Sequence, residues 1–285
     1  MKATDLYMQL EKDFVKPNMT ENWFDYMTDD IKEYICDNFK QRSIGLICDF
    51  TKEVNSVYTA VFPSDKSLTK ILDDGVTNAM LFVHHAADWD LSKDPDKAFY
   101  QMNPELLKKF KERNISIFNF HYPLDNFSEY STSKTLADAL GITITKQFAA
   151  ISGAVCGVIG VTNCKDVHEL NAKYAKAVGH ETKLYKYGSD TILNNTVGIC
   201  AGGGNDPVVV SELIENGINV LISGLSRNNK YSAEAHKLEE EHKINLLGGT
   251  HYSSEKFACI AMCKYFGNLG LPSEFISDIP CLDDL

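Results

Sequence analysis

Histidines recur at three places where the chain is expected to leave a β-strand. His84 and His85 directly follow one apolar run. His121 follows a second run, and His251 lies shortly after a third. Ligand sites of open α/β sheets form just beyond the carboxyl ends of the strands. Imidazole groups with no thiolate nearby suit zinc, iron, manganese, nickel or cobalt better than a structural, cysteine-rich zinc site. These positions therefore predict a divalent metal site.

A carboxylate stands four residues after a histidine in each of these segments. Asp125 follows His121 in this way, and Glu255 follows His251. Asp88 has the same spacing from the first of the paired histidines. On a helix, two residues four apart share one face, so both can reach one cation. The same pairs also occur on solvated helix faces, and a histidine after an apolar strand can be a polar strand end or a hydrogen-bonded core residue.

The two adjacent histidines, His84 and His85, favour two ions over one. Neighbouring residues on an extended strand point to opposite sides. Two ions can each take one ring, whereas a single ion cannot easily reach both. The pattern therefore predicts a two-metal centre.

Short apolar runs alternate with amphipathic helices along the chain. Ser64 and Asn103 are expected N-caps of two such helices. Asp166 and Glu169 form a capping box for a third helix, which ends at Gly179. The expected helices cover residues 65–74, 104–113, 166–179, 206–217, 230–242 and 252–266, the last ending at Gly267, and the expected strands cover residues 78–83, 115–120, 197–201, 219–223 and 244–247. This βαβ order predicts parallel strands with helices on the faces of the sheets.

The length of 285 residues favours two domains or one large domain. The polar stretch 125–134 is the best candidate boundary, because it separates two regions with regular apolar patterns. We therefore predict an α/β protein with two lobes, residues 1–130 and residues 131–285. Each lobe is expected to hold a mixed or parallel sheet flanked by helices.

The charge of the chain argues against one class of partner. It has 28 basic and 39 acidic side chains, which give a net charge of −11. Such a surface repels a phosphate backbone, so no nucleic acid partner is expected. A small molecule or a cation is the favoured ligand.

The cysteines and the N-terminal residues indicate the cytoplasm. The eight cysteines form no CxxC pair and lie mostly in apolar runs, as reduced, buried thiols do. The first residues carry charges throughout and lack the apolar segment of a signal peptide. The longest uncharged stretch, residues 147–164, contains glycines and polar residues, and its apolar part is too short to cross a bilayer. No membrane association is expected.

Three motifs occur in order along the chain. They are Leu-Phe-Val-His-His at 81–85, Phe-His-Tyr-Pro-Leu-Asp-Asn at 120–126 and Gly-Thr-His-Tyr-Ser-Ser-Glu at 249–255. In these motifs the chain resembles the Nif-three-like dinuclear-metal-centre proteins, which are often labelled GTP cyclohydrolase I type 2. The resemblance covers nearly the whole chain, including the Trp23 region and the run 201–204. It implies a Nif-three-like fold with the metal site between two lobes.

The resemblance also implies a set of metal ligands. The five matching positions are His84, His85, Asp125, His251 and Glu255. Glu255 is expected to bridge two divalent ions. His85 and Asp125 would bind one ion, and His84 and His251 the other. Three protein ligands per ion leave positions open for water or substrate, as in catalytic sites.

The activity implied by the resemblance is that of a metal-dependent hydrolase. A metal-activated water would attack a nucleotide or another purine-like or phosphate-bearing substrate, as the label GTP cyclohydrolase indicates. His121 is expected near the ions as a catalytic proton shuttle, an outer hydrogen-bonding partner or an occasional ligand. The alternative function is a non-catalytic, metal-binding oligomeric scaffold or a metal-handling protein. Family members form hexamers, so a homohexamer is expected.

Two segments depart from the family pattern. Ala86 stands where a proline usually follows the paired histidines and begins the segment 86–90. The segment 225–229 replaces an acidic and histidine-bearing one. All five expected ligands are present, so these departures affect the expected substrate more than the expected metals.

The glycine run 201–204 and the following Asp206 lie between a strand and a helix. Backbone amides at such a place can bind a phosphate, but glycines also form a tight turn, and Asp206 is expected to act only as a helix cap. His236 and the run 239–241 are expected on solvated helix faces. Arg227, in the divergent segment, is a candidate contact for a substrate phosphate.

Overall fold

The computed structural model describes residues 1–94 and 97–285. The chain forms two compact units, with residues 1–124 and 259–278 in unit 1 and residues 125–258 and 279–285 in unit 2. The division at 124/125 lies six residues before the predicted boundary, and the segment 259–278 belongs to unit 1. The two predicted lobes, 1–130 and 131–285, stay a prediction.

Unit 1 is built on a five-stranded sheet with the order β1-β6-β3-β2-β13. Its strands are β1 (Gly45–Cys48), β2 (Ser56–Ala60), β3 (Ala79–Val83), β6 (Ile115–Asn119) and β13 (Ser273–Phe275). The four strands from β6 to β13 are parallel, and β1 runs antiparallel to β6. A separate ribbon pairs β4 (Asp88–Trp89) with β5 (Phe99–Tyr100).

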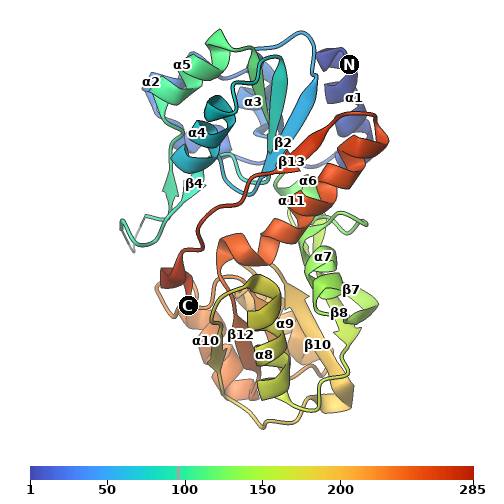
Figure 1. The fold of residues 1–285 in the computed structure, drawn as a ribbon. Coiled ribbons are helices and arrows are strands. Elements are labelled where there is room, and N and C mark those ends of the chain that lie inside the picture. Colours follow the sequence, from blue (N-terminus) through green and yellow to red (C-terminus); the bar gives the residue numbers. More distant parts are fainter. Residues whose placement is uncertain (95–96) are drawn as a thin grey trace. The chain divides into compact units, whose positions relative to one another are not determined.

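Helices cover both faces of this sheet (Figure 1). They are α1 (Ala3–Phe14), α2 (Asp29–Lys32), α3 (Asp37–Arg42), α4 (Asp65–Asp73), α5 (Pro104–Glu112), the short α6 (Tyr122–Asp125), the second half of α11 (His251–Asn268) and the 3-10 turn η1 (Trp23–Tyr26). Leu81 packs with α4 and α5 on one face. The next residue, Phe82, contacts Phe266 of α11 on the other face. The alternation of a strand thus accounts for the two buried faces.

Local capping explains where two helices of unit 1 begin. The side chain of Ser64 accepts a hydrogen bond from the backbone of Ser67 at the start of α4. Asn103 accepts one from Glu105 at the start of α5, where Pro104 occupies the first turn. Each cap satisfies a backbone N–H that has no partner within its helix. The two predicted helix starts are therefore confirmed.

Unit 2 contains a six-stranded sheet with the order β7-β8-β10-β11-β12-β9. Its strands are β7 (Thr143–Ile151), β8 (Ala154–Val161), β9 (Lys183–Tyr185), β10 (Thr196–Cys200), β11 (Val220–Ser223) and β12 (Asn245–Gly248). Its helices are α7 (Thr132–Ala139), α8 (Val167–Val178), α9 (Pro207–Glu215), α10 (Ala233–His242) and the first half of α11. Two 3-10 turns, η2 (Leu193–Asn195) and η3 (Leu282–Asp284), complete the unit. The neighbours β10, β11 and β12 pair in parallel, and the other neighbouring strands of this sheet pair antiparallel. The expected class, a mixed or parallel α/β protein flanked by helices, is confirmed.

Two sequence predictions about secondary-structure elements need correction. The uncharged stretch 147–164 lies largely in the antiparallel pair β7 and β8, which the pattern did not predict. The last helix was expected to end at Gly267 but runs to Asn268. Gly270, with a φ of +79°, lies just beyond its end. A glycine inside a helix destabilises it without necessarily ending it, whereas a left-handed residue cannot continue it.

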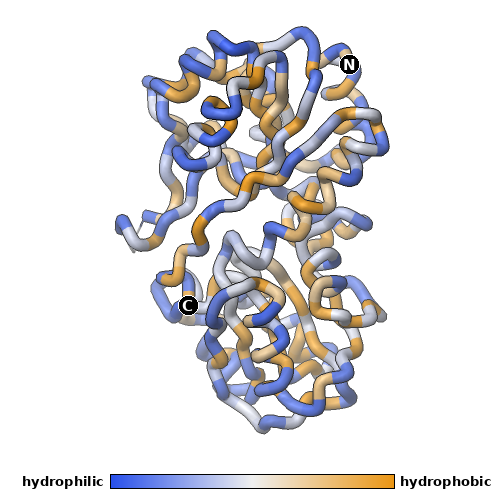
Figure 2. The backbone as a smooth tube through the Cα atoms, viewed as in Figure 1, coloured by the Kyte–Doolittle hydropathy of each residue, from blue (hydrophilic) through white to orange (hydrophobic). Residues whose placement is uncertain are grey.

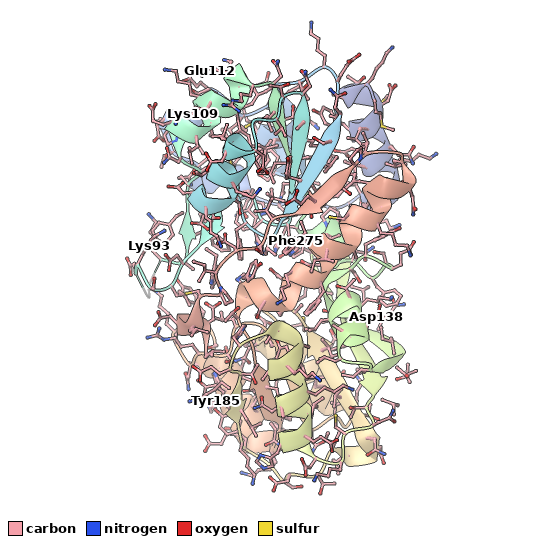
Figure 3. The ribbon with its side chains drawn as sticks, viewed as in Figure 1. Lys93, Lys109, Glu112, Asp138, Tyr185 and Phe275 are labelled. Atoms are coloured by element: carbon pink, nitrogen blue, oxygen red, sulfur yellow. The ribbon has the colours of Figure 1, made fainter. Side chains whose placement is uncertain are left out.

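Hydropathy follows this architecture closely. Figure 2 shows hydrophobic segments along the strands of each unit and hydrophilic segments on the outer sides of the helices. Charged side chains such as Lys109 and Glu112 on α5 and Asp138 on α7 are exposed (Figure 3). No helix in the described part of the chain is both long enough and apolar enough to cross a membrane.

Helix α10 carries two buried polar groups that were predicted to be solvated. His236 is 3% exposed and Glu239 is 0% exposed. The Nδ1 atom of His236 lies 3.4 Å from a carboxylate oxygen of Glu239 and 2.8 Å from the hydroxyl of Tyr187. Residues three apart share one helix face, and this face packs on the Tyr185 ring of β9. The prediction was wrong because α10 is rich in charged residues, so its sequence shows no clear apolar face.

The buried carboxyl of Glu239 should make unit 2 sensitive to pH. Burial raises the pKa of Glu239 to about 8, so the folded chain keeps this proton to higher pH than the unfolded chain, whose glutamates have a pKa of about 4.3. Stability from this group is therefore full below about pH 4.3 and is lost as the pH rises toward 8. Glu239→Gln should be more stable relative to the parent at pH 8.5 than at pH 5. Urea unfolding at both pH values measures this difference.

The matched control is Glu240→Gln, which changes an exposed carboxylate on the same helix. It should shift the free energy of unfolding equally at both pH values. An identical pH response for the two variants would contradict the role assigned to Glu239.

Candidate metal centre

The histidine cluster of unit 1 consists of His84, His85 and His121. His84 and His85 follow β3, and His121 lies two residues after β6. These strands are adjacent and parallel, so their carboxyl ends share one edge of the sheet. The three side chains offer ligand atoms within 4.8 Å of one another. The sheet therefore brings together all three histidines that the sequence placed at strand ends in this unit.

Burial and a hydrogen bond fix the ring of His84. His84 is 0% exposed and His85 is 1% exposed. The Nδ1 atom of His84 lies 2.9 Å from the carbonyl oxygen of Phe120. A carbonyl oxygen can only accept, so Nδ1 carries the hydrogen and Nε2 is the basic nitrogen of the ring. A metal ligand needs such a lone pair, and the ring of His84 therefore fits a metal through Nε2.

Aromatic side chains surround the second ring. His85 stacks on Phe62, with ring centroids 4.8 Å apart, and meets the edge of Trp23 at 5.8 Å. Phe99, on β5, lies 5.9 Å from His85 and 4.9 Å from Trp23. This aromatic wall, made of Phe62, Trp23 and Phe99, excludes water from one side of the cluster and strengthens electrostatic interactions there.

Asp88 has the expected spacing but does not join the cluster. Its side chain pairs with Lys93 at 3.8 Å. Burial raises the pKa of Asp88 to about 6. The groups of described residues that could hold a metal do not include it. Asp88 begins β4 and so lies on an extended segment, where residues four apart do not share a helix face.

The carboxylate cluster of unit 2 consists of Asp125, His251 and Glu255. His251 and Glu255 are the first and fifth residues of α11, and His251 Nε2 lies 3.3 Å from Glu255 Oε1. Asp125 and Glu255 offer ligand atoms within 4.8 Å of each other. Both helix residues are buried, at 4% and 3% exposed. The predicted four-residue spacing therefore does place His251 and Glu255 on one buried helix face.

Two polar contacts hold the carboxylate cluster in place. Thr132 donates its hydroxyl to Asp125 at 2.7 Å. The backbone N–H of His251 donates to the carboxylate of Asp284 at 2.8 Å, and Asp284 is 0% exposed. An acidic side chain at a helix N-terminus is favoured by the helix dipole. Sequence reasoning missed Asp284, because it is 33 residues beyond His251 and outside any motif.

The glycine run approaches the carboxylate cluster closely. A Cβ atom on Gly202 would lie 2.0 Å from Glu255 Oε1, and Gly202 has a φ of +63°. Asp206 accepts a hydrogen bond from Val208 at the start of α9, so its predicted role as a cap is confirmed. The structure thus gives the glycines a steric role beside Glu255, and phosphate binding stays a prediction.

The divergent segment 225–229 packs beside the same glycine run. Leu225 donates its backbone N–H to Gly202 at 2.8 Å. Arg227 pairs with Asp283 at 3.3 Å, so its guanidinium already has an acidic partner. A contact between Arg227 and a substrate phosphate stays a prediction.

The fold and these two clusters define a class of protein: a mixed α/β protein whose buried imidazole and carboxylate groups could hold a metal ion. The sequence pattern of Duf34/NIF3 (NGG1p interacting factor 3) matches residues 35–278. The chain belongs to the DUF34/NIF3 family. The predicted resemblance is therefore confirmed.

Similar proteins carry the same label as the predicted family. A "GTP cyclohydrolase 1 type 2 homolog" of Borreliella burgdorferi is 27% identical over 234 residues, which cover 82% of this chain and 86% of that protein. One of Archaeoglobus fulgidus is 25% identical and covers 83% and 89%.

Solved structures share the fold at lower identity. The protein ybgI, described as of unknown function, has a TM-score of 0.74 at 19% identity, with 99% and 100% of the two chains covered. TTHA1606 from Thermus thermophilus has a TM-score of 0.68 at 17% identity, with 99% and 100% covered. These likenesses establish the fold.

Replacing Gly202 tests the fit between the glycine run and the carboxylate cluster. Gly202→Ala places a Cβ against Glu255 and forces a left-handed conformation on an L-residue, which costs about 1–2 kcal/mol. We expect the free energy of unfolding to fall by at least this amount. Gly203→Ala is the matched control, because its Cβ meets nothing within 4 Å and Gly203 is not among the glycines with a positive φ. Chemical denaturation of both variants measures the difference, and equal stabilities would be inconsistent with the steric role.

Proposed function

We propose that this protein binds two divalent metal ions and uses them to hydrolyse a nucleotide or another purine-like, phosphate-bearing small molecule. The observation that carries the proposal is the gathering of buried imidazole and carboxylate groups beyond strand ends in each unit. We propose that the histidine cluster and the carboxylate cluster supply ligands to one dinuclear centre. The family resemblance of the three motifs supports this joint role.

The chemistry of the donors supports binding of metal. Neutral imidazole and carboxylate oxygens suit zinc, iron, manganese, nickel and cobalt. Buried carboxylates are costly unless a cation or several hydrogen bonds compensate them. The residues that would hold the two ions are His84, His85, Asp125, His251 and Glu255. When bound, the two ions would supply an activated water and charge stabilisation for hydrolysis.

The protein's own residues would assist in three ways. His121 would carry a proton between water and the leaving group, since its ring lies 4.7 Å from that of His85. The aromatic wall would exclude water and offer faces to a planar ring. Thr132 would orient Asp125 through its hydroxyl.

The net charge of the protein makes a metal useful for an anionic substrate. At −11, the chain repels a phosphate group at long range. Two divalent ions would add four positive charges at the site and make the local potential more favourable for a phosphate. The name of the relatives, GTP cyclohydrolase 1 type 2 homolog, supports nucleotides as the first substrates to examine.

The test is reconstitution of metal-free protein followed by hydrolysis assays on a nucleotide panel. We expect two bound ions per chain by elemental analysis and anomalous scattering. Glu255→Ala and His84→Ala should each lower the bound metal and reduce hydrolysis by at least about 100-fold. His168→Ala, which changes a largely exposed histidine paired with Asp190, is the control and should change neither. Hydrolysis that survives in Glu255→Ala would rule out the mechanism.

The assembly and location of the protein are further parts of the proposal. We propose a homohexamer in the cytoplasm, with a small molecule as ligand and no nucleic acid partner. Metal that stays bound without hydrolysis of any substrate would instead favour a metal-binding scaffold or a metal-handling role.

A further inference from the structure

A buried carboxylate from the N-terminal part of unit 1 reaches the histidine cluster. Glu21 lies just before η1, and its side chain is 3% exposed. Its Oε2 atom lies 2.7 Å from Nδ1 of His121 and 2.7 Å from the indole Nε1 of Trp23. Its Oε1 atom accepts the backbone N–H of Tyr122 at 3.2 Å. No motif or spacing pointed to Glu21, because it is 100 residues from His121.

These contacts determine which nitrogen of His121 carries hydrogen. An indole N–H and a backbone N–H can only donate, so both oxygens of Glu21 act as acceptors. The remaining contact at Oε2 is then a hydrogen bond donated by Nδ1 of His121. In a neutral imidazole the other nitrogen is the basic one, so Nε2 of His121 carries the lone pair. His84 reaches the same state through the carbonyl oxygen of Phe120.

We propose that Glu21 is a positioning residue that holds His121 in the Nδ1–H form and directs its Nε2 to the histidine cluster as a metal ligand. A carboxylate hydrogen-bonded to the far nitrogen of a histidine fixes the ring and raises its basicity. The ligand atom of His121 lies within 4.8 Å of those of His84 and His85, so His121 could reach an ion that either of them holds. This inference rests on the proposed function, and it assigns His121 the part of a ligand in addition to that of a proton carrier.

Glu21 also contacts Trp23, whose ring meets the edges of His85 at 5.8 Å and His121 at 5.3 Å. One oxygen thus fixes both the histidine and the aromatic side chain that packs against it. The carboxylate therefore couples the orientation of the ligand to the aromatic wall.

The first experiment needs no metal. In ¹⁵N-labelled, metal-free protein, two-dimensional ¹⁵N–¹H spectra distinguish the two neutral forms of each imidazole, and the signals of His121 are assigned by their loss in His121→Gln. We expect the Nδ1–H form in the parent protein. Glu21→Leu, which removes both acceptor oxygens, should lose this preference, whereas Glu21→Gln keeps one acceptor oxygen and should retain it. The Nε2–H form in the parent protein would overturn the proposal.

The second experiment titrates the metal-free variants with Zn²⁺ alone. Glu21→Leu should bind Zn²⁺ about 10- to 100-fold more weakly than the parent, and Glu21→Gln should lie between them. Asp190→Asn is the matched control, since Asp190 pairs with His168 at 3.2 Å on an exposed surface, and it should bind as the parent does. Unchanged affinity in Glu21→Leu would contradict the proposal.

The two proposals fail in different ways. If the parent protein binds no Zn²⁺, the proposed metal centre fails, and the spectra of the metal-free protein alone decide the role of Glu21. If Glu21→Leu does not fold, the parent spectra and the smaller loss of affinity expected for Glu21→Gln still test it. Circular dichroism of each variant separates loss of the fold from loss of the contact.

Discussion

The burial of several imidazole rings in one place is the constraint on which the histidine cluster depends. The ring centroids of His84, His85 and His121 lie between 4.4 and 5.2 Å apart. His84 and His85 are buried and His121 is partly exposed, and rings this close cannot all be cationic, because like charges in a poorly solvated site repel strongly. Each neutral ring still has one N–H, which needs an acceptor when it is buried. The backbone of Phe120 and the carboxylate of Glu21 supply acceptors for two of the three. With their N–H groups engaged in this way, His84 and His121 each present a basic nitrogen, which is what a metal ion requires.

The carboxylate cluster needs hydrogen-bond donors, whereas the histidine cluster needs acceptors. Carboxylates have lone pairs in excess and need donors or a cation. Thr132 supplies one donor to Asp125, and Gly202 allows the backbone to approach Glu255 without a side chain between them. One cluster is therefore built from imidazoles alone, and the other from two carboxylates and one imidazole. A divalent ion satisfies both kinds of donor set.

The sequence was sufficient to predict the helices and strands that carry these groups and the class of the fold. The starts of α4, α5, α8 and α9 follow from side chains that accept backbone N–H groups, and such caps act over two or three residues. The strand ends at His84 and His121 follow from buried apolar runs that stop at polar residues. The β7 and β8 pair was missed because a glycine-containing, uncharged run has no clear period of two.

The remaining contacts depend on residues that are far apart in the chain. Glu21 contacts His121, which is 100 residues away, and Asp284 contacts His251, which is 33 residues away. No local sequence pattern predicts such pairings. Spacing by itself is also ambiguous. Asp88 has the same four-residue spacing as Glu255, yet it lies on a strand and pairs with Lys93. Buried polar groups occur away from the clusters as well, since Glu239 is fully buried on α10. A functional carboxylate in this chain is therefore recognised only where position at a strand end, helical spacing and burial coincide, and Glu255 meets all three conditions.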